Sequence, residues 1–344
     1  MILDQNNLEE VNKYNEFVRK NEHAQFTQDT AWAHVKNNWH GEYVYLTDSE
    51  GEIRAALSII MIEAVPGSMF MYAPRGPVCD FYDIETVKEL VEAAKPLAEK
   101  YNAFLLRMDP EVFEDDELVE KYRDLGFTFR SKETDLHALV QPRWNVMMDL
   151  AKHEFEGNED DPEYGLNIFK SKTRNSIRKG LKMDCDVIYY EGKDVTEQEV
   201  DIFYELIKIM AERQGINHRP KDYYKRLLEA YPDARLYFIK HEEDYLAGSI
   251  SIPYGKKVAY LYAATSNVKR NYNAGDLLIF ELIKWTHSIG KKYFDFGGVF
   301  SDDSSDGLYK FKKGFAGEEG LFKFIGELDV VYNEEKYQEY LKKQ

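Results

Sequence analysis

The stretch Ala247-Gly248-Ser249-Ile250 occupies the place in the second half of the chain that Ala56-Leu57-Ser58-Ile59 occupies in the first half. Two further pairs of stretches recur in the same order and at nearly the same spacing. They are Met71-Tyr72-Ala73 with Leu261-Tyr262-Ala263, and Phe104-Leu105-Leu106 with Tyr293-Phe294-Asp295. Each match is weak, but the nearly constant spacing predicts that one structural unit is used twice.

The residue patterns predict the same order of elements in both halves. Apolar residues at i, i+3 and i+4 spacing indicate helices, and short apolar runs bounded by turn residues indicate strands. In the first half we expect a helix at 8–20, strands at 43–46, 55–62 and 69–72, a helix at 84–101 and a strand at 104–108. In the second half we expect a helix at 197–214, strands at 236–239, 247–252 and 258–263, a helix at 274–289 and a strand at 293–296.

This order is typical of an acyltransferase-like α/β unit. The predicted fold class is therefore α/β (α+β), with two tandem GNAT-like (acyl-CoA N-acyltransferase-like) domains. Domain 1 is predicted to comprise residues 1–145 and 318–344, and domain 2 residues 146–317. A length of 344 residues suits two such domains. We expect a cleft between them that holds a large substrate.

Composition limits the function further. The net charge of −17 repels nucleic acid in bulk, so any polyanion must meet a local basic patch. The N-terminal residues lack an apolar signal region, and no run of about 18 apolar residues occurs, which predicts a cytoplasmic protein without a membrane span. Cys79 and Cys185 lie far apart without metal-ligand spacing, so we expect neither a zinc site nor a disulfide framework. We also expect no cofactor.

One local basic patch lies at residues 170–182, which contain six basic residues and no acidic one. Read as a helix, this segment carries two basic stripes that are able to follow a phosphate backbone; an ordinary solvated helix is the alternative. The candidate residues for contacts with such a polyanion are Lys172, Arg174, Arg178, Lys179 and Lys182. An acidic loop at residues 154–163 precedes the patch and partly offsets its charge.

Acyl-CoA is the common ligand of the predicted fold, and the sequence argues against it. A glycine-rich loop at the start of a helix lets backbone N–H groups approach the pyrophosphate closely. Here the loop reads Lys269-Arg270-Asn271-Tyr272-Asn273-Ala274-Gly275. We expect the side chain of Tyr272 or Asn273, depending on register, to crowd that approach.

Residues 307–315 set lysines among aromatic rings directly after a Gly-Gly pair at a strand end. A lysine in a site that excludes water is a strong point charge for a phosphate or an oxyanion. The alternative for this stretch is a solvated charge run beside a β-hairpin.

Several motifs occur along the chain in a family-specific order. They are Thr27-Gln28-Asp29, the segment 32–39, Arg75-Gly76-Pro77-Val78, the segment 106–110, the segment 211–220, Tyr260-Leu261-Tyr262-Ala263, Asp295-Phe296-Gly297-Gly298 and the segment 308–312. Together they resemble the FemABX family of non-ribosomal peptidyl transferases over nearly the whole chain. Only about forty residues separate Gly192 and Pro232, which leaves no room for the coiled-coil arm of some members and favours the armless FemX type.

The resemblance implies the partners and the roles of single residues. The partners are aminoacyl-tRNA and UDP-MurNAc-pentapeptide, and we expect a monomer. Lys36 and Arg219 are implied to hold the UDP pyrophosphate, with Tyr223 near the same ligand and Tyr260 and Tyr262 facing the reacting centre from one side of a strand. For the two cations, the alternative is an ordinary helix-terminal residue, which for Arg219 would pair with Asp222 or Glu212.

The implied reaction is attack of a lysine side-chain amine on the ester of an aminoacyl-tRNA. Such an ester needs no covalent enzyme nucleophile. The predicted catalytic residues are Lys312 for the oxyanion or the leaving ribose oxygen, Phe311 for stacking on the tRNA end, and Asp109 for positioning the amine or accepting its proton. Nearby cations are expected to lower the pKa of Asp109, so proton transfer assisted by the substrate is an equal alternative.

The predicted function is thus addition of alanine, serine or glycine to the lysine of the soluble precursor, the first step of interpeptide bridge formation. Two other functions stay open: a non-catalytic module that binds a nucleotide or a partner, and an acyl-CoA N-acyltransferase. The sequence does not choose among the three amino acids. It also does not separate the soluble precursor from the lipid-linked one.

Overall fold

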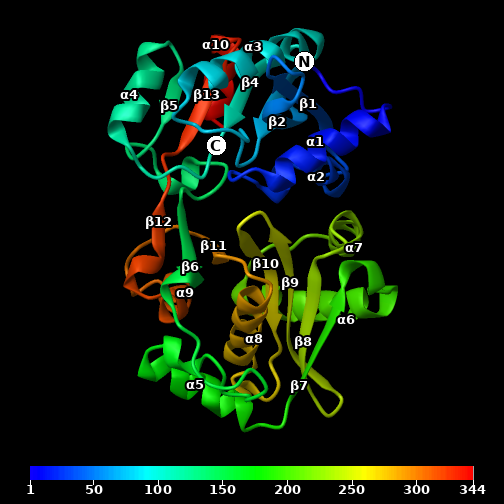
Figure 1. Ribbon diagram of the computed structural model, residues 1–344, viewed down its shortest axis with the longest axis vertical. Coiled ribbons are helices and arrows are strands. Elements are labelled where there is room, and N and C mark those ends of the chain that lie inside the picture. The colour runs from blue at the N-terminus through cyan, green and yellow to red at the C-terminus, as the bar shows by residue number, and fades with distance from the viewer. Residues whose placement is uncertain (344) are drawn as a thin grey trace. The chain divides into compact units, whose positions relative to one another are not determined.

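The computed structural model describes residues 1–343 as two compact units, each built on its own β-sheet (Figure 1). Unit 1 contains Met1–Trp144 and the C-terminal segment from Phe322, and unit 2 contains Asn145–Leu321. The boundaries fall in two strands, β6 (Trp144–Asp149) and β12 (Leu321–Lys323). The C-terminal segment therefore returns to the unit in which the chain begins.

Unit 1 has a six-stranded sheet in the order β1-β2-β3-β4-β13-β5. Its strands are β1 (His40–Thr47), β2 (Ile53–Val65), β3 (Ser68–Ala73), β4 (Ala103–Met108), β5 (Thr128–Arg130) and β13 (Glu327–Val331). Its helices are α1 (Leu8–Lys20), α2 (Ala31–Val35), α3 (Ile84–Lys100), α4 (Asp116–Asp124) and α10 (Glu334–Leu341). The apolar stripe of α3, with Val87, Leu90 and Ala94 fully buried, belongs to the same core as the inner face of the sheet.

Unit 2 has a sheet in the order β12-β6-β11-β10-β9-β8-β7. Its remaining strands are β7 (Asp186–Glu191), β8 (Arg235–His241), β9 (Asp244–Tyr254), β10 (Lys257–Thr265) and β11 (Tyr293–Val299). Its helices are α5 (Ser171–Leu181), α6 (Glu197–Gln214), α7 (Lys221–Ala230), α8 (Ala274–Ser288) and α9 (Gly307–Ala316). The stretch at 307–315 is thus a helix and not part of a hairpin.

The predicted repetition of one unit is confirmed. In unit 1, α3 connects the parallel strands β3 and β4, and in unit 2, α8 connects the parallel strands β10 and β11. Only residues 215–220 separate α6 from α7, and the described chain contains no coiled-coil arm. The predicted fold class, two tandem GNAT-like modules without an arm, is therefore confirmed.

The two parallel strand pairs differ in one respect that matters for function. In unit 1, β3 pairs with β4 along Met69–Ala73, whereas in unit 2 β10 pairs with β11 only along Lys257–Ala259. Beyond Ala259, β10 continues to Thr265 without ladder partners on that side, and a bulge interrupts its register with β9 between Tyr260 and Tyr262. The sheet of unit 2 is therefore open at one end.

A buried charge cluster attaches the C-terminal strand β13 to unit 1. The guanidinium of Arg107 on β4 donates two hydrogen bonds of 2.7 Å to the carboxylate of Asp329 on β13. Neighbouring Glu327 accepts from Arg130 at 2.7 Å and lies 3.2 Å from Arg107. Because all these charges are buried, the pairing of β4 with β13 depends on each keeping its partner.

Candidate functional site

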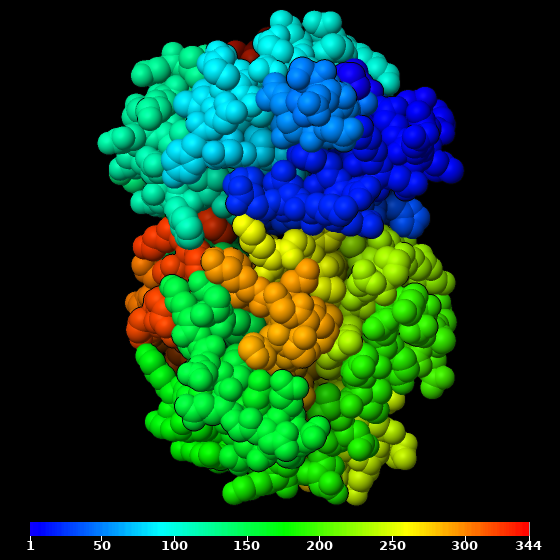
Figure 2. Space-filling view, viewed as in Figure 1, coloured from blue at the N-terminus to red at the C-terminus, as the bar shows by residue number. Residues whose placement is uncertain are grey.

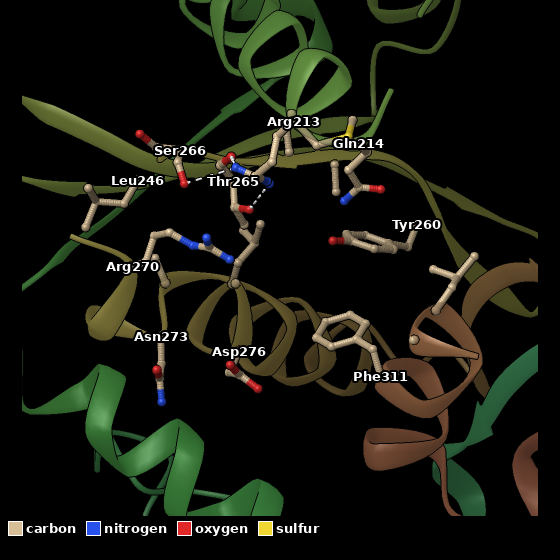
Figure 3. Close-up of a pocket in the computed structure, with 18 of the residues that line it drawn as sticks. Arg213, Gln214, Leu246, Tyr260, Thr265, Ser266, Arg270, Asn273, Asp276 and Phe311 are labelled. Carbon is tan, nitrogen blue, oxygen red and sulfur yellow. Dashed lines mark hydrogen bonds between the residues drawn. The ribbon is translucent and has the colours of Figure 1, made fainter. Parts of the chain in front are cut away.

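The open end of the unit 2 sheet contains a cavity of about 700 Å³ (Figure 3). Its walls come from the end of β10 beyond its pairing with β11, the N-terminus of α8, the C-terminal end of α6 and the helix α9. The lining residues used below are Arg213, Tyr260, Arg270, Asn273, Phe311 and Lys312. The separation of β10 from β11 thus creates a site that the sequence alone did not reveal.

Lys312 lies in the wall of this cavity. The helix α9 begins after Asp306, whose side chain accepts a 2.7 Å hydrogen bond from the Tyr309 N–H and so caps the helix. Lys312 is only 8% exposed, and its Nζ donates a 2.8 Å hydrogen bond to the carbonyl oxygen of Gly298. Burial lowers the pKa of Lys312 to about 8, against the opposing effects of Asp295 and Asp306.

The residues next to Lys312 differ from it in their surroundings. Lys313 forms a 2.6 Å ion pair with Glu318, and Lys310 is exposed and is not part of the cavity wall. Phe311 is 39% exposed and lines the cavity, with its ring 5.4 Å from that of Phe315. Lys312 is therefore the only one of the three lysines in 310–313 that faces the cavity, and an exposed aromatic ring lies beside it.

The expected crowding at the start of α8 is wrong. Asn273 has a left-handed backbone, and its side-chain amide donates to the carbonyl and hydroxyl oxygens of Ser176 on α5, at 3.1 and 3.0 Å. Figure 3 shows this side chain directed away from the cavity. Tyr272 packs against His241, with the ring centroids 4.9 Å apart. Neither side chain fills the space in front of the helix, because contacts far away in sequence hold both elsewhere.

Two arginines line the same end of the cavity. Arg213 donates to the backbone oxygen and the hydroxyl of Thr265, both at 2.9 Å, and so fixes the end of β10. Arg270 extends into the cavity in Figure 3. Burial, and then the nearby charge of Arg270, lowers the pKa of Arg213. Sequence reasoning did not single out these residues, although both lie in stretches quoted above.

Tyr260 and Tyr262 do not share one side of the strand as predicted, because the bulge in β10 interrupts the alternation of side chains. Tyr260 lines the cavity beside Lys312, and burial raises its pKa. Tyr262 lines a second cavity of about 530 Å³ in unit 2 and donates a 3.1 Å hydrogen bond to the hydroxyl of Tyr223 on α7. The two tyrosines therefore serve different cavities.

The second cavity also contains Arg219. This residue lies just before α7, and its guanidinium lies 5.5 Å from the centre of the Tyr223 ring. Within residues 1–343, Arg219 forms no ion pair, so the alternative of pairing with Asp222 or Glu212 does not apply. Its charge is exposed and borders Tyr262.

The two predicted site residues of unit 1 lie in different settings. Lys36 follows the short helix α2, is half-buried and lies 5.3 Å from the ring centre of Trp32. Asp109 follows β4 and is buried.

The Asp109 carboxylate accepts hydrogen bonds from the Arg75 N–H at 2.6 Å and the Tyr72 hydroxyl at 2.9 Å. Burial raises the pKa of Asp109, although Arg75 opposes the shift. The expected lowering of its pKa by nearby cations is therefore wrong, because loss of hydration outweighs them.

The basic segment forms a helix, α5, as predicted. Figure 2 shows its green segment at the surface of unit 2. Lys172, Lys179 and Lys182 are exposed, whereas Arg174 is half-buried. Arg178 is held by Glu163 of the acidic loop at 2.8 Å. The contact of Asn273 with Ser176 joins α5 to the start of α8, whose first residues line the cavity.

Comparisons with known proteins agree with the predicted fold and family. The FemAB family model matches residues 10–240 and 238–343. The chain is 35% identical to a UDP-N-acetylmuramoylpentapeptide-lysine N(6)-alanyltransferase of Weissella viridescens, over 99% of each chain. It is 25% identical to a lipid II:glycine glycyltransferase of Staphylococcus aureus, over 95% of this chain and 92% of the relative.

Solved structures with the same fold include the crystal structure of FemX. It matches with a TM-score of 0.83 and 22% identity, over 96% of this chain and 98% of that chain. A tandem GNAT protein from the clavulanic acid pathway matches with a TM-score of 0.55 and 11% identity, over 96% of this chain and 97% of that chain. The predicted enzyme class, an aminoacyltransferase, agrees with the names of the relatives. The chain belongs to the FemAB family.

Proposed function

We propose that this enzyme transfers an amino acid, alanine in the first instance, from aminoacyl-tRNA to the lysine side-chain amine of UDP-MurNAc-pentapeptide. The observation that carries the proposal is the buried ammonium of Lys312 in the wall of the unit 2 cavity. The name of the Weissella viridescens relative, which is similar over its full length, supports the choice of acceptor and of alanine. Every helix among residues 1–343 is too short or too polar to span a bilayer. We also propose that the enzyme acts as a cytoplasmic monomer, because the proposed acceptor is a soluble molecule.

The chemistry is aminolysis of an ester. The neutral lysine amine attacks the carbonyl carbon, the new C–N bond forms, and the bond to the ribose oxygen breaks. The amine loses one proton and the ribose oxygen gains one. Lys312 stabilises the negative charge that develops first on the carbonyl oxygen and then on the ribose oxygen. Phe311, exposed at the cavity, stacks on a base of the tRNA end.

The donor is proposed to lie in the unit 2 cavity. Arg270 and the N-terminal end of the α8 dipole provide positive charge, which suits a phosphate near the tRNA acceptor end. The exposed lysines of α5 then meet the backbone of the tRNA further along, since this helix is joined to the start of α8 through Ser176 and Asn273. Tyr260 lines the same cavity and positions the aminoacyl group.

The acceptor is proposed to use the remaining predicted residues. Lys36 and Arg219 each supply a cation to the diphosphate, and the hydrogen-bonded pair of Tyr223 and Tyr262 contacts the same ligand. We propose that Asp109 helps to position the attacking amine. Hydrogen-bond donors of the protein already occupy its carboxylate, which makes it a poor proton acceptor. Proton transfer assisted by the substrate then remains the simpler route for the attacking amine.

A donor competition tests the proposal. The enzyme is incubated with UDP-MurNAc-pentapeptide and alanyl-, seryl- or glycyl-tRNA, or with acetyl-CoA, and the mass of the precursor is followed. We expect a gain of one amino-acid residue that depends on charged tRNA. The experiment with acetyl-CoA is needed because the Asn273 side chain bonds to Ser176 and leaves the start of α8 open, where acyl-CoA binds in the common fold. A gain of one acetyl group would favour the acyl-CoA alternative, and binding without any gain would favour the non-catalytic one.

If Lys36 and Arg219 both contact the diphosphate, Lys36→Ala and Arg219→Ala should each weaken binding of the UDP precursor. Each substitution removes a charge-assisted contact of about 1.5–3 kcal/mol, so the Kd for the UDP precursor is expected to rise about 10- to 100-fold. Isothermal titration with the UDP precursor measures this, with Lys310→Ala as a control that removes an exposed lysine outside the cavity. Unchanged affinity in both variants would contradict the assignment.

The basic helix predicts a salt effect. Replacement of Lys172, Lys179 and Lys182 by Gln is expected to weaken tRNA binding and to make it less dependent on salt, with the slope of log K against log salt falling by about 1 per lost phosphate contact. The matched control replaces Lys95, Lys121 and Lys152, three exposed lysines elsewhere. Equal slopes for the two triple variants would show that α5 is an ordinary surface helix.

A further inference from the structure

A buried charged pair lies behind Lys312 in unit 2. The carboxylate of Asp295 on β11 accepts a 2.8 Å hydrogen bond from Lys257 Nζ on β10 at one oxygen. Its other oxygen accepts a 2.7 Å bond from the side-chain amide of Asn145 on β6. All three residues are buried, so these bonds join the central strands of the sheet in the region where β10 and β11 are still paired.

The same carboxylate determines the turn that follows. The oxygen that meets Asn145 also accepts a 2.8 Å hydrogen bond from the N–H of Gly297. Gly297 has a φ of +80°, a left-handed conformation that suits glycine, and its neighbour Gly298 presents its carbonyl oxygen to Lys312 Nζ at 2.8 Å. A continuous series of hydrogen bonds thus runs from Lys257 and Asn145 through Asp295 to the turn and Lys312.

We propose that Asp295 is a positioning residue for the reaction, which fixes the Gly297-Gly298 turn so that its carbonyl oxygen holds the Lys312 ammonium at the cavity wall. The proposal rests on the transfer reaction proposed above. Asp295 contacts neither the cavity nor the proposed substrates, and it acts through the turn. In this arrangement Lys257 and Asn145 keep the carboxylate in place.

The charges around Lys312 make the role of Asp295 measurable. Burial disfavours ionisation of Asp295, but Lys257 and the N–H donors together hold the pKa of Asp295 below its ordinary value. The charged groups that act on Lys312 are Asp295 of β11 and Asp306 at the start of α9. Lys257 lies on the other side of Asp295, to which it donates a hydrogen bond. Tyr260 is a further titratable residue of the cavity wall. Loss of the Asp295 charge therefore disfavours the ammonium form of Lys312.

The test compares Asp295→Asn with the wild type in the full-length protein. Labelling with acetic anhydride across pH 6–10, read by peptide mass spectrometry without any substrate, reports the titration of Lys312, with the exposed Lys310 as internal reference. We expect the Lys312 titration to move down by about one pH unit. The alkaline decline of kcat is expected to move with it, while KM for the UDP precursor stays unchanged.

Three further variants distinguish an effect of Asp295 on the position of Lys312 from an effect of general destabilisation. Asp295→Ala also removes the acceptor for Gly297 and is expected to lose about tenfold more in kcat than Asp295→Asn. The double variant Asp295→Asn/Lys257→Met leaves neither buried charge of this pair without its partner. We expect it to move the Lys312 titration downward, as Asp295→Asn does. Ile283→Ala, in the core of α8, serves as a destabilised control without a shift.

An unshifted Lys312 titration in folded Asp295→Asn or in the double variant would overturn the inference. A shift that the Ile283→Ala control reproduces would overturn it as well. If the wild type transfers nothing, the proposed function fails, and the labelling experiment still decides whether Asp295 controls Lys312.

Discussion

Lys312→Met is expected to lower kcat about 100- to 1000-fold while the Kd for UDP-MurNAc-pentapeptide stays unchanged. The ammonium of Lys312 lies in the cavity wall and donates a 2.8 Å hydrogen bond to Gly298, so the methionine removes the charge and leaves most of the packing. The loss falls on kcat because the charge stabilises the oxyanion, which exists only in the transition state and the intermediate. Single-turnover transfer from charged tRNA measures the chemical step directly.

The pH dependence provides the control for this prediction. Because burial lowers the pKa of Lys312 to about 8, its stabilising charge is complete well below pH 8 and is lost as the pH rises through that value. The wild type is therefore expected to lose kcat above about pH 8, and Lys312→Arg is expected to retain part of the activity without this decline. A Lys312→Met enzyme with a near-normal rate would contradict the assigned role, whereas Lys310→Met should behave as wild type.

Arg107→Met is expected to destabilise unit 1 by about 3–5 kcal/mol. The substitution leaves Asp329 without its two 2.7 Å hydrogen bonds from Arg107 and leaves Glu327 with Arg130 as its remaining guanidinium partner. Tyr337 still donates to Asp329 at 2.8 Å, but a neutral hydroxyl does not compensate a buried carboxylate. The pairing of β13 with β4 should weaken first, because these charges join the two strands.

Amide hydrogen exchange measures this effect in each unit separately. Peptides from β13 and β4 are expected to exchange much faster in Arg107→Met, while peptides from β8 and β9 of unit 2 stay protected. Arg107→Met/Asp329→Asn should recover part of the loss, because it removes one of the unpaired charges. Equal protection of β13 in Arg107→Met and the wild type would show that the charge cluster contributes little.

The elements could be predicted from the sequence because local residues determine them. The helices α1 and α6 have the predicted bounds, since Asn7 caps the first, and Thr196 with Glu199 forms a capping box at the start of the second. The cavity could not be predicted in this way. It depends on where β10 separates from β11 and on the contact of Asn273 with Ser176, and both are interactions between residues distant in sequence.

The site residues show the same division. The aromatic frame indicated the lysines of 307–315, and the family resemblance implied Lys312 among them. The burial of Lys312 and its bond to Gly298 come from the turn after β11. The predicted common side for Tyr260 and Tyr262 assumed a regular strand, and one bulge separates them. The direction of the Asp109 pKa depends on complete burial, which charge counting along the chain does not reveal.

The most direct test maps the product of one reaction. Enzyme, alanyl-tRNA and UDP-MurNAc-pentapeptide are mixed, and tandem mass spectrometry locates any added residue while the release of uncharged tRNA is counted. We expect one alanine on the lysine side-chain amine for each tRNA released. Release of free alanine with an unmodified precursor, or addition at another position of the peptide, would contradict the proposed function.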